Sequence, residues 1–242
     1  MSLILLSGCS SNRVADSLVE KPLQPRISFV TNGLSGGLDY LVYLPPGAGL
    51  PVQQQFPLIV FLHGVELKGE PLARLLDTAI VQSASNQQTS PFILVAPSCP
   101  ANRSWERQPL QEMLSQVEAR YPVDKRRVYL TGYSLGGFAT WAWAIAEPGR
   151  FAAIAPIAGG GDESKACSLK NLRIWAFHGA KDPVVPLQNS KRMVDAVNAC
   201  GGDARLTISQ SGHVGWDIIY LQRQETVPVA FSKRQKRTTQ TF

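Results

Sequence analysis

The stretch RVYLTGYSLGGFATWAWAIA, residues 127–146, indicates the fold of this chain. Its first five residues are mostly apolar and β-branched, as in a buried strand, and the residues from Phe138 on are typical of a buried helix. Between them lies a G-x-S-x-G motif centred on Ser134. A serine at such a tight strand-to-helix turn is exposed to substrate, next to helix N–H groups that favour negative charge. Ser134 is therefore a candidate nucleophile, although a serine at this place can also be a helix N-cap.

A serine nucleophile needs a histidine as base and a carboxylate that orients the histidine. The chain has three histidines, His63, His178 and His213. In a strand-elbow-helix architecture the chain order is serine, acid, histidine, and His213 is the histidine that follows both Ser134 and a candidate acid. We interpret His213 as the base rather than an ordinary loop residue, and His178 as a hydrogen-bonded structural residue.

Two aspartates compete for the role of the acid. Asp182 follows a buried-strand pattern in IWAFHGAKDPVVP, residues 174–186, so it is expected just beyond the carboxyl end of a strand, where catalytic groups gather in open α/β sheets. Asp162, in the run GGGDE, follows an earlier strand. The prediction favours Asp182, although an aspartate before a proline can also be a simple turn residue.

Acyl transfer also requires N–H donors for the oxyanion of the tetrahedral intermediate. One predicted donor is the main-chain N–H of Leu135, directly after the nucleophile. The second is predicted in the loop that follows the strand at 57–62 and reads HGVEL, where Val65 comes directly after His63 and Gly64.

These motifs together resemble the α/β-hydrolase superfamily. Within it they are similar to phospholipase/carboxylesterase, dienelactone-hydrolase-like and polyhydroxybutyrate-depolymerase-like esterases, a group that includes feruloyl and acetylxylan esterases. The resemblance spans residues 38–220. It implies catalysis by Ser134, Asp182 and His213 without a cofactor, oxyanion donors at Val65 and Leu135, and a substrate site lined by His63, Trp105 and Trp216.

The chain departs from this group at two places. Val214 stands where such esterases often have an acidic residue, which leaves open what anchors the His213 loop. After Thr226 the sequence shows no helical apolar period, whereas related esterases continue with an amphipathic helix.

Length and patterning indicate one α/β domain of the α/β-hydrolase type, a three-layer α/β/α sandwich around a mostly parallel, twisted sheet of about eight strands without a separate lid domain. At 242 residues the chain is long enough for one substantial core. The strands are expected near 26–31, 39–44, 57–62, 92–96, 127–132, 152–157, 172–178 and 204–209. The helices are expected near 71–84, 107–121, 135–147 and 187–200.

The catalytic domain is predicted over residues 26–221, with distinct segments at both ends. Leu6-Ser7-Gly8-Cys9 resembles a bacterial lipobox, although its apolar run is shorter than usual and no basic residue precedes it. Residues 1–25 would then be a signal and tether, with a lipid anchor at Cys9 and a location in the cell envelope or outside the cell. An accidental likeness would leave a cytoplasmic protein. Residues 222–242 are predicted to be a disordered basic tail.

Setting Cys9 aside, three cysteines remain, so that an exported protein could form one disulfide among them. The sequence favours Cys167 and Cys200, on segments that flank the Asp182 strand, but does not decide between pairings. Neither the cysteines nor the three histidines have a metal-ligand spacing, so no metal site is predicted.

The formal net charge of +6 does not point to nucleic acid, because most of it comes from the tail. We therefore predict a carboxylic ester hydrolase that acts on small-molecule or polymer-end esters through an acyl-enzyme on Ser134. The alternatives are a prolyl-oligopeptidase-type peptidase, which normally carries a further propeller domain, and a non-catalytic surface lipoprotein with a hydrolase fold. The oligomeric state is not predicted.

Overall fold

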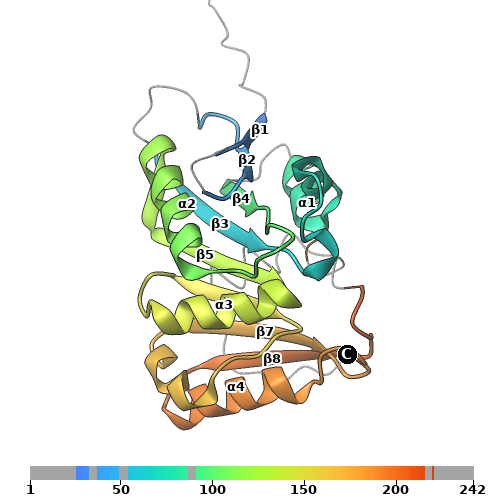
Figure 1. Cartoon of the computed structure of the whole chain (residues 1–242). Coiled ribbons are helices and arrows are strands. Elements are labelled where there is room, and N and C mark those ends of the chain that lie inside the picture. Colours follow the sequence, from blue (N-terminus) through green and yellow to red (C-terminus); the bar gives the residue numbers. More distant parts are fainter. Residues whose placement is uncertain (1–25, 33–36, 49–53, 87–90, 216–219, 221–242) are drawn as a thin grey trace, which may run out of the picture.

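A single sheet organises the computed structural model of the protein, which describes residues 26–32, 37–48, 54–86, 91–215 and 220 (Figure 1). Within these residues the strand order is β1-β2-β4-β3-β5-β6-β7-β8. The strands are β1 (Arg26–Val30), β2 (Tyr40–Leu44), β3 (Phe56–Leu62), β4 (Ile93–Pro97), β5 (Val123–Tyr133), β6 (Ala153–Ile157), β7 (Arg173–Gly179) and β8 (Ala204–Ser209). The predicted eight strands are confirmed.

The sheet is parallel over most of its width. Strands β4, β3, β5, β6, β7 and β8 run parallel to one another, whereas β2 pairs antiparallel with both β1 and β4. The carboxyl ends of the six parallel strands therefore meet at one edge of the sheet, which is where open α/β sheets place their ligand sites.

The two faces of the sheet bury separate cores. Alternation along β3 sends Leu58, Val60 and Leu62 into one core and Ile59 and Phe61 into the other. Both sets are buried, which is why the strand reads as a continuous apolar run.

Helices cover both faces and make three layers. The first core is closed by α2 (Arg107–Arg120), α3 (Leu135–Ala146) and α4 (Gln188–Ala199), which lie along the same side of the sheet in Figure 1. In α2 the buried residues Leu110, Met113, Leu114 and Val117 follow the spacing of one helix face. The second core is covered by α1 (Ala79–Asn86), the short 3₁₀ segments η2 (Val65–Leu67) and η3 (Leu72–Asp77), and Tyr220. A further 3₁₀ segment, η4 (Glu163–Leu169), packs beside α4.

Three of the four predicted helices are confirmed. The fourth prediction, one continuous helix, is wrong. The stretch predicted as one helix over 71–84 is divided into η3 and α1, because Thr78 is extended and its hydroxyl bonds the Leu75 carbonyl. Strand β5 also starts four residues earlier than predicted, at Val123. The residues that follow Val123 are polar, so no apolar run marked the start of the strand. The pairing of β5 with β3 is also irregular there.

The predicted anchor and tether over residues 1–25, the tail over residues 222–242 and Trp216 lie outside the described residues. Among the helices of the described part, none has the length and apolar character needed to cross a membrane.

Candidate active site

The turn between β5 and α3 holds Ser134 in an unusual backbone conformation. Its φ of 53° and ψ of −114° lie in a region that residues other than glycine rarely adopt. The Ser134 N–H donates to the Ile157 carbonyl of the neighbouring strand at 3.0 Å, which helps to hold this conformation. Strained backbone of this kind concentrates at functional sites.

The two glycines of the G-x-S-x-G motif permit close packing around the elbow. A Cβ at Gly136 would overlap the carbonyl oxygen of Leu62, and one at Gly132 would overlap the Gly136 carbonyl. The start of α3 therefore lies directly against the end of β3, and a side chain at either glycine would push the two apart.

Three side chains from three strand ends form a hydrogen-bonded chain at the carboxyl edge of the sheet. His213 Nε2 lies 2.9 Å from Ser134 Oγ, and His213 Nδ1 lies 2.7 Å from Asp182 Oδ2. A carboxylate only accepts, so Nδ1 carries the proton and Nε2 can accept the Ser134 hydroxyl. The imidazole is thus oriented so that Nε2 can remove the proton of Ser134.

Asp182 is held as an anion by the loop that contains it. Its Oδ1 accepts the main-chain N–H groups of Val184 at 2.9 Å and Val185 at 2.8 Å. Burial of the carboxyl raises the pKa of Asp182, but the hydrogen bonds from His213, Val185 and Val184 outweigh burial and hold it below its ordinary value. The carboxylate is therefore ionised when it faces His213.

The competing carboxylate, Asp162, lies elsewhere. It caps η4, where it accepts from the Ser164 N–H at 3.1 Å and pairs with Lys165 at 3.2 Å. These contacts, above all the hydrogen bond from the Ser164 side chain, lower the pKa of Asp162. The Asp162 carboxylate therefore caps a helical turn, whereas the carboxylate that contacts the His213 imidazole belongs to Asp182.

His178 supports the loop of Asp182 from inside the protein. Its Nε2 donates to the Val185 carbonyl at 2.8 Å, and its Nδ1 lies 2.7 Å from the hydroxyl of Ser190 on α4. Burial lowers the pKa of His178, although the Val185 carbonyl and Asp182 favour its charged form. These contacts agree with the structural role expected for His178, because Val185 in turn donates to Asp182.

The two predicted oxyanion donors come from neighbouring strands. Leu62 pairs with Gly132 across β3 and β5, and Val65 and Leu135 each follow three residues later. Leu135 is the first residue of α3, where N–H groups have no acceptor within the helix. Val65 opens η2, after an extended Gly64 whose N–H donates to the Glu66 carboxylate at 3.1 Å.

The side chains of His63 and Trp105 form hydrogen bonds to the main chain in and beside the Val65 loop. His63 is only 1% exposed, its Nε2 accepts the Cys99 N–H at 3.0 Å, and its Nδ1 donates to the Gly64 carbonyl at 2.7 Å. Burial lowers the pKa of His63, so the ring is neutral. The prediction that this side chain lines the substrate site does not fit, because both ring nitrogens bond to protein groups. The Trp105 indole N–H donates to the His63 carbonyl at 3.1 Å, and its contact with substrate stays a prediction.

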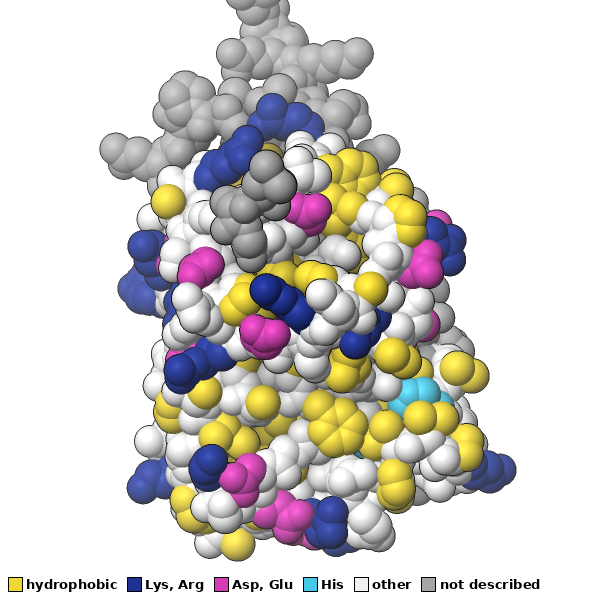
Figure 2. All heavy atoms as spheres, viewed as in Figure 1, with side chains coloured by type: hydrophobic (Ala, Val, Ile, Leu, Met, Phe, Trp, Pro, Cys, Tyr) yellow, Lys and Arg dark blue, Asp and Glu magenta, His cyan; other side chains and the backbone are white. Residues whose placement is uncertain are grey.

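Apolar side chains surround the site. Val65, Val184 and Val214 expose 63%, 64% and 77% of their surface, and each belongs to a loop that carries a site residue. Phe138, in the first turn of α3, is also exposed. Of the three histidines only His213 is not buried, and Figure 2 shows hydrophobic side chains gathered around the histidine at the surface. We name Val65, Phe138, Val184 and Val214 the apolar rim.

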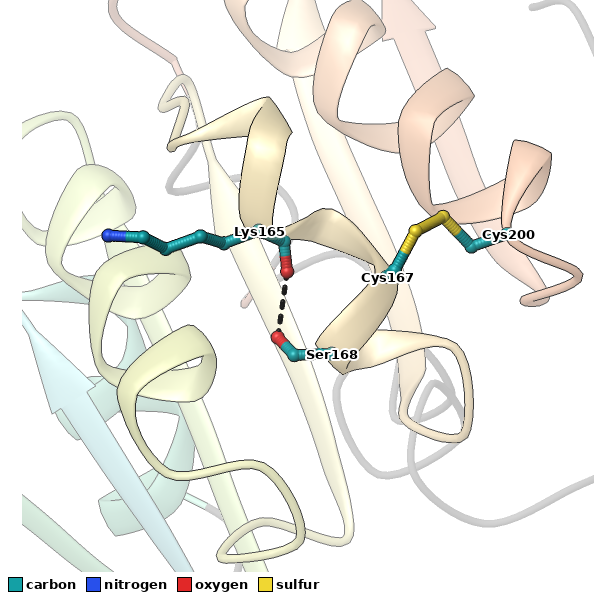
Figure 3. The surroundings of a disulfide bond; sticks show 4 residues. All are labelled: Lys165, Cys167, Ser168 and Cys200. Atoms are coloured by element: carbon teal, nitrogen blue, oxygen red, sulfur yellow. Dashed lines mark hydrogen bonds between the residues drawn. A yellow bond between two sulfur atoms is a disulfide. The ribbon is translucent and has the colours of Figure 1, made fainter.

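A disulfide between Cys167 and Cys200 joins η4 to the end of α4 (Figure 3). This is the pairing that the sequence favoured without deciding it. The disulfide restrains α4, the helix on which Ser190 contacts His178.

Cys99 is a buried free thiol, and burial raises its pKa. Within the described residues no group of three or more histidine, cysteine, aspartate or glutamate side chains could hold a metal ion.

One contact at the site was not predicted from the sequence. The hydroxyl of Tyr133, the residue before Ser134, donates to the main-chain carbonyl of His213 at 2.6 Å. Tyr133 was visible in the motif, but nothing in the sequence indicates where its side chain points.

Comparison with known proteins places these features in a family. The family model "Esterase" matches residues 32–209. A poly(3-hydroxyalkanoate) depolymerase C from Paucimonas lemoignei is 31% identical over 144 residues, which are 55% of this chain and 33% of that protein. The "Probable feruloyl esterase C" of Aspergillus terreus is 26% identical over 178 residues, which are 69% of this chain and 63% of that protein. The chain thus spans less than two thirds of either relative.

Solved structures agree on the fold. A thermostable esterase has a TM-score of 0.69 at 29% identity, with coverage of 86% of this chain and 62% of that one. A feruloyl esterase module from Clostridium thermocellum, solved in complex with sinapinate, has a TM-score of 0.68, with coverage of 99% of this chain and 100% of that one. Its identity of 18% establishes a shared fold only.

Proposed function

The chain belongs to the Esterase family of α/β-hydrolases, and we propose that it is a serine carboxylic-ester hydrolase with Ser134 as nucleophile. The observation that carries this proposal is the chain of hydrogen bonds from Ser134 through His213 to Asp182. An ionised, buried carboxylate behind an imidazole whose Nε2 faces the serine hydroxyl is the arrangement that general-base activation of a serine requires.

The proposed reaction has two halves. Ser134 Oγ attacks the ester carbonyl while His213 Nε2 takes its proton, and His213 then protonates the leaving alcohol. Water, activated by the same imidazole, hydrolyses the acyl-enzyme. Asp182 stabilises the imidazolium that forms in each half. The N–H groups of Val65 and Leu135 would hold the oxyanion, each donor being worth about 10²–10³ in turnover.

We further propose that the substrate presents an apolar group beside the ester bond. The apolar rim leaves several valine and phenylalanine surfaces exposed around Ser134, and covering them with a substrate would release water from apolar surface. A poly(3-hydroxyalkanoate) depolymerase and a feruloyl esterase are among the relatives. A bifunctional acetylxylan esterase/xylanase from Neocallimastix patriciarum, 26% identical over 163 residues (63% of this chain, 22% of that protein), makes acetylated polysaccharide the second candidate class.

A panel of esters assayed on the purified protein tests this function. We expect hydrolysis of p-nitrophenyl butyrate and octanoate with a higher kcat/KM than that of p-nitrophenyl acetate, because one buried CH₂ contributes about 0.8 kcal/mol, or roughly fourfold. Methyl ferulate, acetylated xylan and a peptide anilide complete the panel. Activity on the anilide alone would instead support a peptidase, and inactivity on every compound would support a non-catalytic protein.

We also propose a lipid anchor at Cys9, on the lipobox-like sequence Leu6-Ser7-Gly8-Cys9, which lies outside the described residues. Two or more acyl chains hold a protein firmly at a membrane. When the gene is expressed in a bacterium that processes lipoproteins, the protein should partition into detergent. The Cys9→Ser variant should stay in the aqueous phase with unchanged esterase activity. An unmodified Cys9 in mass spectra of the membrane-expressed protein would contradict the anchor.

A further inference from the structure

Within the described residues, a hydrogen bond from a tyrosine hydroxyl anchors the main chain of the loop at His213. Before His213, the loop is tied to the Asp182 loop by hydrogen bonds from the Ala180 N–H to Ser209 and from the Lys181 N–H to Ser211, at 2.8 and 3.1 Å. From residue 212 to residue 215, one hydrogen bond reaches the main chain within the described part of the protein. It comes from the hydroxyl of Tyr133 to the carbonyl of His213, at 2.6 Å.

The Tyr133 ring also lies beside the imidazole. The two ring centroids are 5.2 Å apart, with an angle of 38° between the planes. The phenol therefore restrains His213 in two ways, by its hydroxyl at the main chain and by its ring at the side chain. The flanking Gly212 and Gly215 add no side chain to this restraint, and the Val214 side chain is exposed to solvent.

The position of Tyr133 in the chain makes this anchor direct. Tyr133 is the last residue of β5, in register with Ile157 of β6, and the next residue is Ser134. One end of a central strand thus carries both the nucleophile and the group that holds the base. The nucleophile and the anchor of the base therefore share one support.

We propose that Tyr133 is a positioning residue that holds His213 at hydrogen-bonding distance from Ser134. The proposal rests on the proposed serine-esterase function. Transfer of the proton from Ser134 needs the imidazole to stay in place within a fraction of an ångström, and misplacement by about 1 Å can cost on the order of 10² in rate. The hydroxyl acts on the base rather than on the substrate, so its loss should affect kcat and not KM.

The variant Tyr133→Phe removes the hydroxyl and keeps the ring. We expect kcat for p-nitrophenyl butyrate to fall roughly 10- to 100-fold, with KM changed less than about twofold. The matched control is Tyr129→Phe, on the same strand and the same face, about 13 Å from Tyr133. The control should keep the wild-type kcat. Incorporation of 4-aminophenylalanine at position 133 restores a donor and should recover most of the lost activity.

A second measurement needs no substrate. The proton that His213 Nδ1 shares with Asp182 should give a low-field ¹H NMR resonance in the wild type and in Tyr129→Phe, and the resonance should shift or broaden in Tyr133→Phe. An unchanged resonance in Tyr133→Phe would overturn the proposal, even with a lower kcat, since the loss would then come from another contact. A kcat within twofold of the wild type would overturn it as well. A wild type that hydrolyses no ester would reject the function instead, and the resonance would still test the anchor.

Discussion

In the Ser134→Ala variant, kcat for ester hydrolysis is expected to fall by about 10⁴–10⁶-fold, the largest effect predicted for this protein. The loss follows from the absence of the Ser134 Oγ, the atom that is acylated, which leaves His213 and Asp182 without a nucleophile to activate. Adding His213→Ala should cost little more, because the members of such a chain act as a unit. Steady-state kinetics on p-nitrophenyl butyrate measure both effects.

Covalent labelling checks the same prediction without turnover. A fluorophosphonate should modify the wild type at Ser134, located by mass spectrometry of the peptides, and should not modify Ser134→Ala. Ser168→Ala is the control: its hydroxyl donates to the Lys165 carbonyl beside the disulfide, as Figure 3 shows, and its removal should change neither labelling nor activity. Labelling of another residue with complete loss of activity would refute Ser134 as nucleophile.

A smaller but still large effect is expected for Asp182→Asn, which should reduce kcat by about 10⁴-fold. The amide can still accept the N–H groups of Val184 and Val185 with its oxygen, so the loop should keep its shape. Its NH₂ group would face His213 Nδ1 and donate to it, which moves the imidazole proton to Nε2. The ring could then no longer accept the Ser134 proton, and the charge that stabilises an imidazolium would be gone.

Asp162→Asn is the matched control for this change. It also removes a carboxylate charge, but at the start of η4, where the amide oxygen can still accept the Ser164 N–H. We expect its kcat within about twofold of the wild type. Urea denaturation of both variants separates loss of chemistry from loss of folding. The opposite order of the two kcat values would identify Asp162 as the acid.

Local patterns in the sequence predicted most elements of the fold. Apolar runs predicted all eight strands, because a strand that is buried on both faces of a sheet is apolar along its whole length. The helix predicted over 71–84 failed because Thr78 interrupts it through its own hydrogen bond to Leu75. A contact of this kind depends on one side-chain conformation, to which apolar periodicity is insensitive.

The sequence by itself determined that Ser134 lies on an elbow between a strand and a helix, and that an acid and a histidine follow at later strand ends. The tertiary structure decided which groups meet: His213 contacts Asp182 from 31 residues away and Ser134 from 79. It also decided that His63 is buried and that the Tyr133 hydroxyl contacts the carbonyl of His213, 80 residues later in the chain. The physical reason is that main-chain conformation follows from neighbouring residues, whereas contacts between distant side chains depend on the order of strands in the sheet and on the direction in which each side chain leaves it.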